Sequence, residues 1–396
     1  MSESNETSIA LLLNGSERYG VGQSIETLAA ELARIGRPFM LISVAPGPGV
    51  DRLESLGHRV TVIGDKPIPP IVGKNLYARS AQASKGVEAR AKLVAKLVRA
   101  LESAHALAVY VRWPTLMPLA GAAARQLGGR AYWHMPNVVG RTLPLGLNKW
   151  LLQLTCWRHK VLPMANSRFT AATLGSWPVT PEVLYVGSDT RRFNPDAVVF
   201  RERKEVAVDS SALVVGVAGR LVRSKGQDRL LEALLRVDHP LASRLTLLCL
   251  GGPAEGEYAD RLRDIAARAG ASDRLVLAGH VDDVPSWYGM VDVAVNARID
   301  AEPYGQSVVE AMMMRRPVLA HAFGGPAETV VDGTTGWHSP STEVADWTEA
   351  LKRVLDDQPR WVEMGNAARK RALAYFSAEA FRDRLLTFID ADSGRG

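Results

Sequence analysis

Short apolar runs alternate with amphipathic segments along the first half of the chain. Runs of strand length occupy residues 9–13, 39–44, 60–63, 107–111, 131–134 and 183–186. Segments with the period of a helix lie between them, at 24–35, 52–56 and 86–106. Nearly continuous apolar runs are typical of parallel strands that are buried on both faces. The pattern therefore predicts a doubly wound, Rossmann-like α/β domain.

The alternation starts again after a stretch rich in Pro and charged residues, at 194–211. Further strand-length runs occupy residues 213–218, 245–250, 275–278, 291–296 and 318–320. After Trp337 the pattern predicts helices only, at 343–355, 360–375 and 378–390. We therefore predict a second Rossmann-like domain over 194–376, with the first over 1–193. Ligands of such sheets bind at the carboxyl ends of the strands, so we expect them in a cleft between the two domains.

Composition narrows the class of protein. A chain of 396 residues with 47% hydrophobic content can form two cores of ordinary size. Cys156 and Cys249 are the only cysteines, so a disulfide framework or a cysteine metal site is not indicated. The histidines lack the spacing of metal ligands, and we predict no metal and no cofactor. The apolar run 9–13 is too short for a signal peptide or a membrane span, so we expect a cytoplasmic protein.

Positive charge is concentrated in the first half of the chain. Residues 1–190 contain 21 Lys and Arg but 12 Asp and Glu, and residues 103–181 contain no acidic residue. Such a field attracts phosphates, anionic lipid or nucleic acid. We predict no nucleic-acid partner, because no basic-aromatic repeat or zinc-finger pattern occurs. An anionic membrane surface, and with it a peripheral position on the inner face of the cell membrane, stays open.

Two helical segments are candidates for contact with lipid. The helix 86–106 carries four cations, Arg90, Lys92, Lys96 and Arg99, beside three leucines, and such a helix can lie on anionic lipid. An ordinary surface helix fits it equally well. Four apolar residues of the next segment, Trp150, Leu151, Leu154 and Trp157, have helical spacing, and we predict that they belong to the core.

The segment 301–311 places two carboxylates around a turn at the predicted start of a helix. Pro303 and Gly305 turn the chain, and the amides from Tyr304 to Ser307 are expected to point outward, where they attract a phosphate. Glu302 precedes this anion site and Glu310 follows it, and carboxylate oxygens can bind sugar hydroxyls. The arrangement indicates a site for a nucleotide sugar, although a capped helix with solvated acids is the alternative.

A second element of the same half carries two cations between a strand and a helix. Gly219 and Arg220 follow the run 213–218, and Lys225 comes shortly before the next helical segment. Cations aimed at a diphosphate would stabilise the charge that grows as it departs. Solvated loop charges are the alternative.

Two motifs of the first half also lie where such folds keep functional residues. His134 is predicted at the end of a strand, where Pro136 stops regular structure. A structural histidine is the alternative to a catalytic one. Gly20 and Gly22 are predicted to form a turn before a helix, where backbone can approach a ligand closely. They do not form a dinucleotide-binding fingerprint, because Ile25 stands at the position of the third glycine.

Together these residues resemble glycosyltransferase family 4, the retaining nucleotide-sugar transferases with the GT-B fold. The most specific part is the pair Glu302 and Glu310 at the family's spacing, supported by Gly219-Arg220 and Lys225-Gly226. The chain departs from the family pattern in three places. Arg316 stands where Gly usually precedes Pro, Asn296-Ala297-Arg298 replaces the common Pro-Ser, and the first glycine turn lacks a Gly-Gly pair.

The resemblance implies roles for these residues. It implies that Glu310 binds the ribose, that Glu302 binds the donor sugar, and that Arg220 and Lys225 bind the phosphates. His134 would line the sugar site, and the final helix, 377–396, would cross back to the first domain and belong to it. The catalytic set is then His134, Glu302, Arg220 and Lys225. The residues implied to bind the donor are Gly20, Gly22, Gly219, Arg220, Lys225, Val281, Glu302, Pro303, Tyr304, Gly305, Gln306, Ser307 and Glu310.

The resemblance also implies a reaction. A hexose, mannose or glucose, would pass from a GDP- or UDP-linked donor to a lipid-linked saccharide of surface polysaccharide or glycolipid synthesis. We expect front-face substitution with retained configuration, because 103–181 offers no acid as nucleophile, although Glu17, Glu26 and Glu302 remain as alternatives. An epimerase or phosphorylase of the same architecture and a non-catalytic sugar-nucleotide sensor or membrane adaptor are the rival functions.

Overall fold

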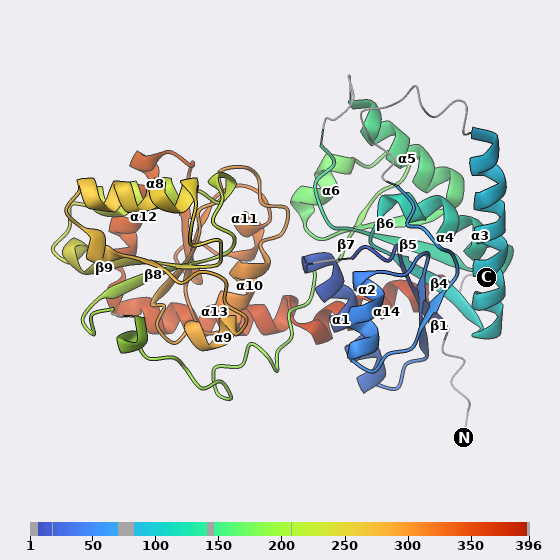
Figure 1. Ribbon diagram of the computed structural model, residues 1–396, viewed down its shortest axis with the longest axis horizontal. Helices are drawn as coiled ribbons and strands as arrows, with labels where there is room; N and C mark the ends of the chain where they lie inside the picture. The colour runs from blue at the N-terminus through green and yellow to red at the C-terminus, as the bar shows by residue number, and fades with distance from the viewer. Residues whose placement is uncertain (1–6, 18, 70–82, 141–145, 207, 394–396) are drawn as a thin grey trace. The chain divides into compact units, whose positions relative to one another are not determined.

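A computed structural model of the chain describes residues 7–17, 19–69, 83–140, 146–206 and 208–393 (Figure 1). The chain divides into two compact units. Unit 1 comprises Met1–Gly187 and Ala378–Gly396, and unit 2 comprises Ser188–Ser377. Each unit has its own parallel sheet, which confirms the predicted pair of α/β domains.

The division differs slightly from the predicted boundaries at 193/194 and 376/377. Ser188 belongs to unit 2 because its amide donates to the carbonyl oxygen of Phe376 at 2.9 Å and it bridges to Ser377. Phe193 is buried, and its carbonyl oxygen accepts a hydrogen bond from Arg369. The segment 188–193 therefore belongs to unit 2. The change in composition that suggested a boundary begins only at residue 194, after the structural boundary.

The sheet of unit 1 has seven strands in the order β3-β2-β1-β4-β5-β6-β7, and every neighbouring pair is parallel. The strands are β1 Ser8–Leu13, β2 Phe39–Ser43, β3 Val60–Val62, β4 Ala106–Val111, β5 Arg130–Met135, β6 Val161–Ala165 and β7 Glu182–Val183. Sequence reasoning missed β6, because Pro163 interrupts a short run and cannot donate to a ladder. Its prediction of a strand over 183–186 was too long.

Helices cover both faces of this sheet (Figure 1). They are α1 Tyr19–Arg34, α2 Pro48–Ser55, α3 Ala83–Ser103, α4 Met117–Gln126, α5 Leu147–His159, α6 Arg168–Leu174 and α14 Ala378–Ser393. The last helix, α14, packs on α1, where Arg382 pairs with Glu31 at 2.6 Å. Phe381, Leu385 and Ile389 of α14 join the same buried core, so the predicted return of the final helix to the first domain is confirmed.

The sheet of unit 2 has six parallel strands in the order β10-β9-β8-β11-β12-β13. They are β8 Leu213–Ala218, β9 Leu245–Leu250, β10 Leu275–Leu277, β11 Val293–Asn296, β12 Val318–His321 and β13 Gly336–Ser339. The prediction that only helices follow Trp337 was wrong for β13. That edge strand has four residues, begins with Gly, and lacks the apolar run by which the others were found.

Seven α-helices belong to the described part of unit 2. They are α7 Gln227–Arg236, α8 Glu257–Arg268, α9 Val284–Trp287, α10 Gln306–Met313, α11 Pro326–Thr329, α12 Val344–Asp356 and α13 Trp361–Tyr375, with short 3-10 turns such as η5 Arg223–Lys225 between them. Trp337 and Trp347 are fully buried in the core that α7 and α12 form against the sheet.

The two helical segments considered for lipid contact differ in which residues they bury. Leu97 and Leu101 of α3 are fully buried, so this helix uses its apolar face for the core of unit 1. The apolar residues that we predicted as core in α5 are instead exposed, Trp157 by 61%. Among the described residues, no helix combines the length and the apolar character that crossing a bilayer requires.

Candidate active site

The loops that follow β8, β11 and β12 meet at the carboxyl edge of the sheet of unit 2, because these strands are neighbours. Two glycines allow the loops to touch through their backbones. Gly226, at φ 69°, has no room for a side chain, since a Cβ there would lie 2.1 Å from the carbonyl oxygen of Ala297. A Cβ on Gly324, at φ 87°, would lie 2.5 Å from the carbonyl oxygen of Glu302. Close backbone packing therefore fixes the position of the charged residues on these loops.

A carboxylate held by two cations lies at this edge. Lys225 Nζ donates to Glu302 Oε2 at 3.0 Å, and Arg298 Nη1 donates to the same oxygen at 3.2 Å. The three side chains are 22%, 14% and 24% exposed, so they are partly shielded but open to solvent. Among the described residues, no hydrogen bond occupies Glu302 Oε1. The carboxylate can therefore accept a hydroxyl of a ligand while its charge stays balanced.

Arg298 is the residue of this cluster that sequence reasoning missed. It lies on the loop after β11, and its Nε donates to Asp300 Oδ1 at 2.6 Å. The hydrogen bond from Arg298 lowers the pKa of Asp300, and the bond to Asp300 raises the pKa of Arg298, with Glu302 adding to the effect. The sequence offered a single signal for Arg298. The segment Asn296-Ala297-Arg298 departs from the Pro-Ser that is common in the family pattern.

Helix α10 begins directly after Glu302, Pro303 and Tyr304. Gly305 is its N-cap in a left-handed conformation, with φ 88° and ψ 58°. The first amides of the helix, at Gln306 and Ser307, have no intrahelical acceptor, as at any helix start, and they can bind an anion. The side chains of Pro303 and Tyr304 are buried, so these residues can offer only backbone groups to a ligand at the start of α10. The ring of Tyr304 packs edge-on against Phe376 at 6.5 Å.

The second carboxylate, Glu310, lies one turn into α10 and is half-buried. Burial raises the pKa of Glu310 to about 7, and the nearby charge of Arg192 and a hydrogen bond from Gln306 oppose this effect. Arg192 also donates to the carbonyl oxygen of Asp282, on the loop that carries Val281. Val281 is half-buried and follows β10, so the loop at this end of the sheet contributes to the same neighbourhood.

Arg220 follows β8 and differs from Lys225 in its surroundings. Its side chain is exposed, and among the described residues it forms no hydrogen bond or ion pair. Its backbone is held, because Gln227, fully buried, donates from Nε2 to the carbonyl oxygen of Arg220 at 3.0 Å. Gly219 precedes it with φ 154° and donates to Leu250. A fixed backbone with a free guanidinium suits the binding of an anion.

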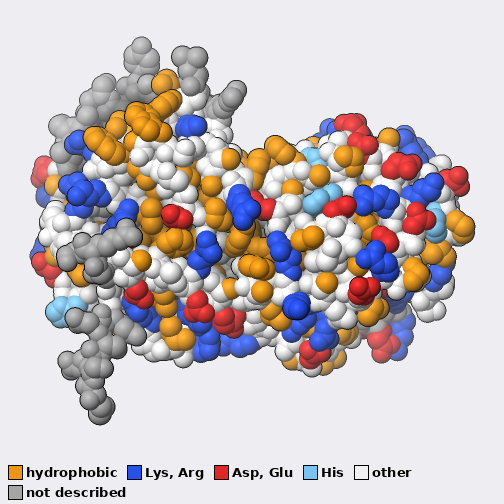
Figure 2. Space-filling model, turned by 180° about the vertical axis from the view of Figure 1, so that it is seen from behind, with side chains coloured by type: hydrophobic (Ala, Val, Ile, Leu, Met, Phe, Trp, Pro, Cys, Tyr) orange, Lys and Arg blue, Asp and Glu red, His pale blue; other side chains and the backbone are white. Residues whose placement is uncertain are grey.

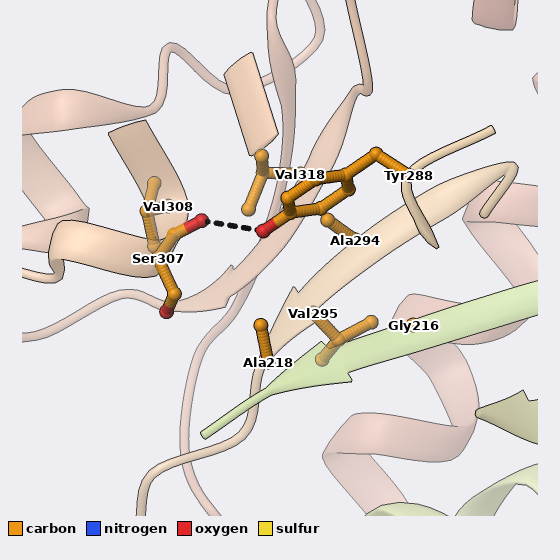
Figure 3. Close-up of a pocket in the computed structure, with 8 residues that line it drawn as sticks. All are labelled: Gly216, Ala218, Tyr288, Ala294, Val295, Ser307, Val308 and Val318. Atoms are coloured by element: carbon orange, nitrogen blue, oxygen red, sulfur yellow. Dashed lines mark hydrogen bonds between the residues drawn. The ribbon is translucent and has the colours of Figure 1, made fainter. Parts of the chain in front are cut away.

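A small cavity lies between α10 and the sheet, next to this edge (Figure 3). Tyr288 donates through its hydroxyl to the carbonyl oxygen of Ser307 at 3.3 Å, at one wall of the cavity. The other lining residues are Gly216, Ala218, Ala294, Val295, Val308 and Val318. With a volume of about 10 Å³, the cavity is at the lower limit for one water molecule. A space of this size is too small to hold a nucleotide sugar.

His134 belongs to unit 1. It is 0% exposed at the end of β5, and its Nε2 donates to the carbonyl oxygen of Leu184 at 2.7 Å. Its Nδ1 then accepts from Tyr110 Oη and Arg112 Nη1, each at 2.6 Å. Burial, and after it the charge of Arg112, holds the pKa of His134 well below its ordinary value. This geometry favours a neutral histidine, and the catalytic role implied for His134 stays a prediction.

Gly20 and Gly22 also belong to unit 1, and the predicted turn before the helix is wrong. Both lie within the first turn of α1, and a Cβ on Gly20 would meet no atom within 4 Å. The close backbone approach occurs earlier, at Gly15, where a Cβ would lie 2.3 Å from the carbonyl oxygen of Ala45. Glu17 accepts the amides of Asn14 and Gly15 and so orders this loop before α1 begins.

Across the part of the chain that the structure describes, no three His, Cys, Asp or Glu side chains are grouped as they would be around a metal ion. The absence of metal from the reaction stays a prediction.

Comparison with known proteins places these residues in a wider context. Residues 198–371 match the family model "Glycosyl transferases group 1", and this segment contains every unit 2 residue implied to bind the donor. The D-inositol 3-phosphate glycosyltransferase of Corynebacterium kroppenstedtii is 31% identical over 218 residues, which cover 53% of this chain and 48% of that protein. The chain thus spans about half the length of the curated relatives it matches.

Two further similarities extend this comparison. A GDP-mannose-dependent alpha-(1-6)-phosphatidylinositol monomannoside mannosyltransferase of Mycobacterium tuberculosis is 31% identical over 220 residues, covering 53% of this chain and 56% of that protein. The solved structure of Anabaena HepE in complex with UDP matches 97% of this chain and 100% of its own, with a TM-score of 0.78 and 20% identity. That likeness confirms the GT-B fold, and together the comparisons support a glycosyltransferase.

Proposed function

We propose that this protein is a retaining glycosyltransferase that moves a hexose, mannose or glucose, from a GDP- or UDP-linked donor to a lipid-linked saccharide. The observation that carries the proposal is the carboxylate Glu302, held by Lys225 and Arg298 beside the start of α10. A sugar diphosphate requires hydrogen-bond acceptors for its hydroxyls next to hydrogen-bond donors for its phosphates. This edge of the sheet offers both.

Each residue then has a defined task. Glu302 Oε1 accepts a hydroxyl of the donor sugar, and the first amides of α10 donate to the diphosphate. Arg220 binds a phosphate oxygen, and Lys225 turns from Glu302 toward the diphosphate as charge grows there. Arg298 stays on Glu302, so that the carboxylate keeps one cation throughout. Glu310 accepts the ribose hydroxyls.

Front-face substitution fits the available acids. The acceptor hydroxyl oxygen bonds to the anomeric carbon on the face from which the diphosphate departs, and the departing phosphate oxygen takes the hydroxyl proton. A covalent route would need a free carboxylate as nucleophile. Glu302 has two cations on Oε2, and its other oxygen is assigned in this proposal to a hydroxyl of the donor sugar. Glu17 is buried with both oxygens accepting backbone amides at 2.6 and 2.8 Å, and Glu26 pairs with Arg52 at 3.3 Å. Cations of the protein neutralise the leaving group, so no metal is required.

The acceptor is proposed from charge and from the relatives. Unit 1 has no acidic residue over 103–181, which favours an anionic acceptor such as a diphosphate-linked or phospholipid-linked saccharide. The two relatives named above act, by their names, on an inositol phosphate and on a phosphatidylinositol mannoside. We place the reaction in the synthesis of a surface polysaccharide or glycolipid, at the cytoplasmic face of the membrane.

A panel of donors tests the proposal. The purified chain is incubated with UDP-glucose and GDP-mannose, each with and without a polyprenyl-diphosphate saccharide or phosphatidylinositol, and with and without a chelator. We expect release of one nucleoside diphosphate that depends on the acceptor and survives chelation, with the new bond in the donor's anomeric configuration. A changed sugar without acceptor would indicate an epimerase instead. Stabilisation by nucleotide with no release under any condition would indicate a sensor or adaptor.

A further inference from the structure

Helix α5 of unit 1 turns its apolar side outward. Five of its residues and one from the loop after α6 are exposed by about half or more, namely Leu147 (48%), Trp150 (50%), Leu151 (46%), Leu154 (52%), Trp157 (61%) and Trp177 (70%). We call these six residues the α5 apolar face. Figure 2 shows hydrophobic side chains gathered at this end of unit 1, at the upper left. Three exposed tryptophans in one patch are unusual, because large apolar side chains are normally buried.

The inner side of α5 carries two buried amides, Asn148 and Gln153. They lie beside Cys156, which joins the hydrophobic core of unit 1, and Leu152, which packs against that core. Gln153 is fully buried and uses both ends of its amide. Its Nε2 donates to the carbonyl oxygens of Gly175 and Val179 at 2.8 and 2.9 Å, and its Oε1 accepts the amide of Val179 at 3.0 Å. The hydrogen bonds of Gln153 on the inner side therefore fix the orientation in which the apolar side of α5 faces outward.

The same bonds attach Trp177 to the helix. Gln153 holds the loop on both sides of Trp177 against α5. The rings of Trp150 and Trp177 then meet edge to face, with their centroids 5.5 Å apart and an angle of 74°. The α5 apolar face is therefore a prearranged surface of two segments, and little conformational entropy remains to be lost when it binds.

Several cations lie on α5 and near its C-terminal end, and α5 contains no acidic residue. Lys149 lies on α5, and Arg158 and Lys160 are exposed at its end. Arg125 of α4 donates to the carbonyl oxygen of Arg158 at 3.1 Å. The charges of Arg158, Arg125 and Arg90, from α5, α4 and α3, all lower the pKa of His159, as burial does, so they converge on the end of the helix. Residues 103–181 contribute no opposing carboxylate.

We propose that the α5 apolar face docks on an anionic phospholipid bilayer, with its tryptophans and leucines in the interface and the cations at the lipid headgroups. Tryptophan favours the membrane interface, and basic side chains are attracted to anionic lipid. The charge selects lipid over a second copy of this chain, because two such faces would bring their cations together. The inference gives the proposed lipid-linked acceptor a place of delivery and rests on that function for its purpose. Lipid binding itself needs neither donor nor transfer.

Vesicle sedimentation without donor or acceptor tests the docking. The full chain is mixed with vesicles of phosphatidylcholine alone, or with vesicles of phosphatidylcholine that contain about 30 mol% of the anionic lipid phosphatidylglycerol. We expect binding to the mixed vesicles, a loss of at least tenfold in Trp150→Ser/Trp157→Ser, and a loss of roughly fivefold per cation in Arg90→Gln/Arg158→Gln. Val199→Ser/Val362→Ser is the matched control, since both residues are exposed on unit 2, and it should bind as the parent does.

Thermal stabilisation by UDP-glucose and GDP-mannose is measured on every variant. An unchanged ligand shift shows that a variant is folded, so a loss of vesicle binding cannot come from unfolding. No binding to mixed vesicles by the parent, or equal binding by parent and Trp150→Ser/Trp157→Ser, would overturn the proposal. So would concentration-dependent dimers in sedimentation velocity that the tryptophan variant abolishes while vesicles bind neither protein. Vesicle binding without any ligand shift or transfer would leave the docking standing and count against the transferase.

Discussion

The carboxyl edges of the two sheets hold polar clusters in equivalent places, yet the clusters differ in where their bonds point. In unit 1, Arg112 is 3% exposed and directs Nη1 to His134, whose other nitrogen is bound to a backbone carbonyl. In unit 2, Lys225 and Arg298 direct their charges to Glu302, which keeps one oxygen toward solvent. One cluster is turned into its own unit, and the other leaves a position open for a ligand.

The difference teaches how a shared topology serves different purposes. The ends of parallel strands collect side chains at one edge, but only a cluster with an unused acceptor or donor can recognise a substrate. His134 is neutral, since its pKa is held well below the ordinary value, and its Nδ1 lone pair serves Arg112. Glu302 has charge and an unused oxygen. We therefore predict that the chemistry depends on unit 2 and that the network of unit 1 is structural.

The largest effect is expected from Lys225→Ala. This change removes a cation from Glu302 and from the departing diphosphate, and the loss of one such donor costs about 3 to 4 kcal/mol in comparable sites. We expect kcat to fall on the order of a hundredfold or more, measured as nucleoside diphosphate release with saturating donor. Lys204→Ala is the matched control, because Lys204 also pairs with a glutamate of unit 2 but is 78% exposed. Turnover of the Lys225 variant within tenfold of the parent would remove Lys225 from the catalytic set.

A smaller loss is expected from Arg298→Gln. Glu302 would keep Lys225 as partner while at rest but would lose its second cation when Lys225 turns to the diphosphate. A hydrogen bond between charged groups contributes about 1.5 to 3 kcal/mol, which corresponds to roughly ten- to a hundredfold in kcat/KM. Arg263→Gln, in an exposed ion pair of α8, serves as the control. If Arg298→Gln equals its control, the cluster is not a functional unit and Arg298 only anchors its loop.

Arg298 also shows what the sequence could not predict. The strands of unit 2 were predictable, since their apolar runs are long and separated by charged helices, as in 213–218 and 245–250. The pairing of Glu302 with Lys225 depends instead on how loops 77 residues apart pack at Gly226 and Gly324. Local patterns carry no such information. The motif predicted which carboxylate matters, and the tertiary contacts decided which cations hold it.

Helix α5 illustrates the opposite error. Its apolar spacing predicted a core contact, because a helix with one apolar side normally buries that side. The structure buries the opposite side, where Gln153 forms hydrogen bonds with Leu174, Gly175 and Val179. Periodicity identifies the helix and its two faces, but it cannot tell which face a protein turns inward when both can be satisfied.

An effect of several-fold is expected from pH at Glu310. Burial raises its pKa to about 7, so the folded protein holds a proton that an unfolded chain releases near the ordinary value of 4.5. Its contribution to stability is therefore greatest below about pH 4.5 and is lost as the pH rises through about 7. Ribose hydroxyls donate best to the ionised carboxylate, so we expect affinity for the donor to increase several-fold from pH 6 to pH 8.

Titration calorimetry with a nucleotide sugar checks this expectation. A sugar ester is preferable to a free nucleoside diphosphate, whose terminal phosphate itself titrates near about pH 6. Glu310→Gln cannot ionise, and its affinity should be nearly constant over the same range. The parent's thermal stability should fall between pH 4.5 and 7 by more than that of Glu310→Gln. Equal pH profiles for the two proteins would show that Glu310 does not bind the donor in its ionised form.

The smallest effect on turnover is expected from His134→Ala, although the side chain of His134 is more deeply buried than that of Glu302. Removing the ring leaves Arg112 without the acceptor of its Nη1 and Tyr110 without a partner for its hydroxyl, which costs about 1 to 3 kcal/mol for each buried group. The melting temperature of unit 1 should fall by several degrees, while kcat of the folded protein at low temperature stays within about threefold.

The contrast between stability and turnover is what decides the role of His134. A histidine that lines the sugar site would lower kcat and leave the melting temperature nearly unchanged, as the exposed His280→Ala should do for stability. His134→Asn sharpens the test, because its amide can restore one of the two bonds of the ring but has no basic nitrogen. Recovery of melting temperature in His134→Asn, with turnover equal to that of His134→Ala, would fix the residue as a support of Arg112. A hundredfold fall in kcat for both variants would return His134 to the reaction and erase the proposed division of labour between the two sheet edges.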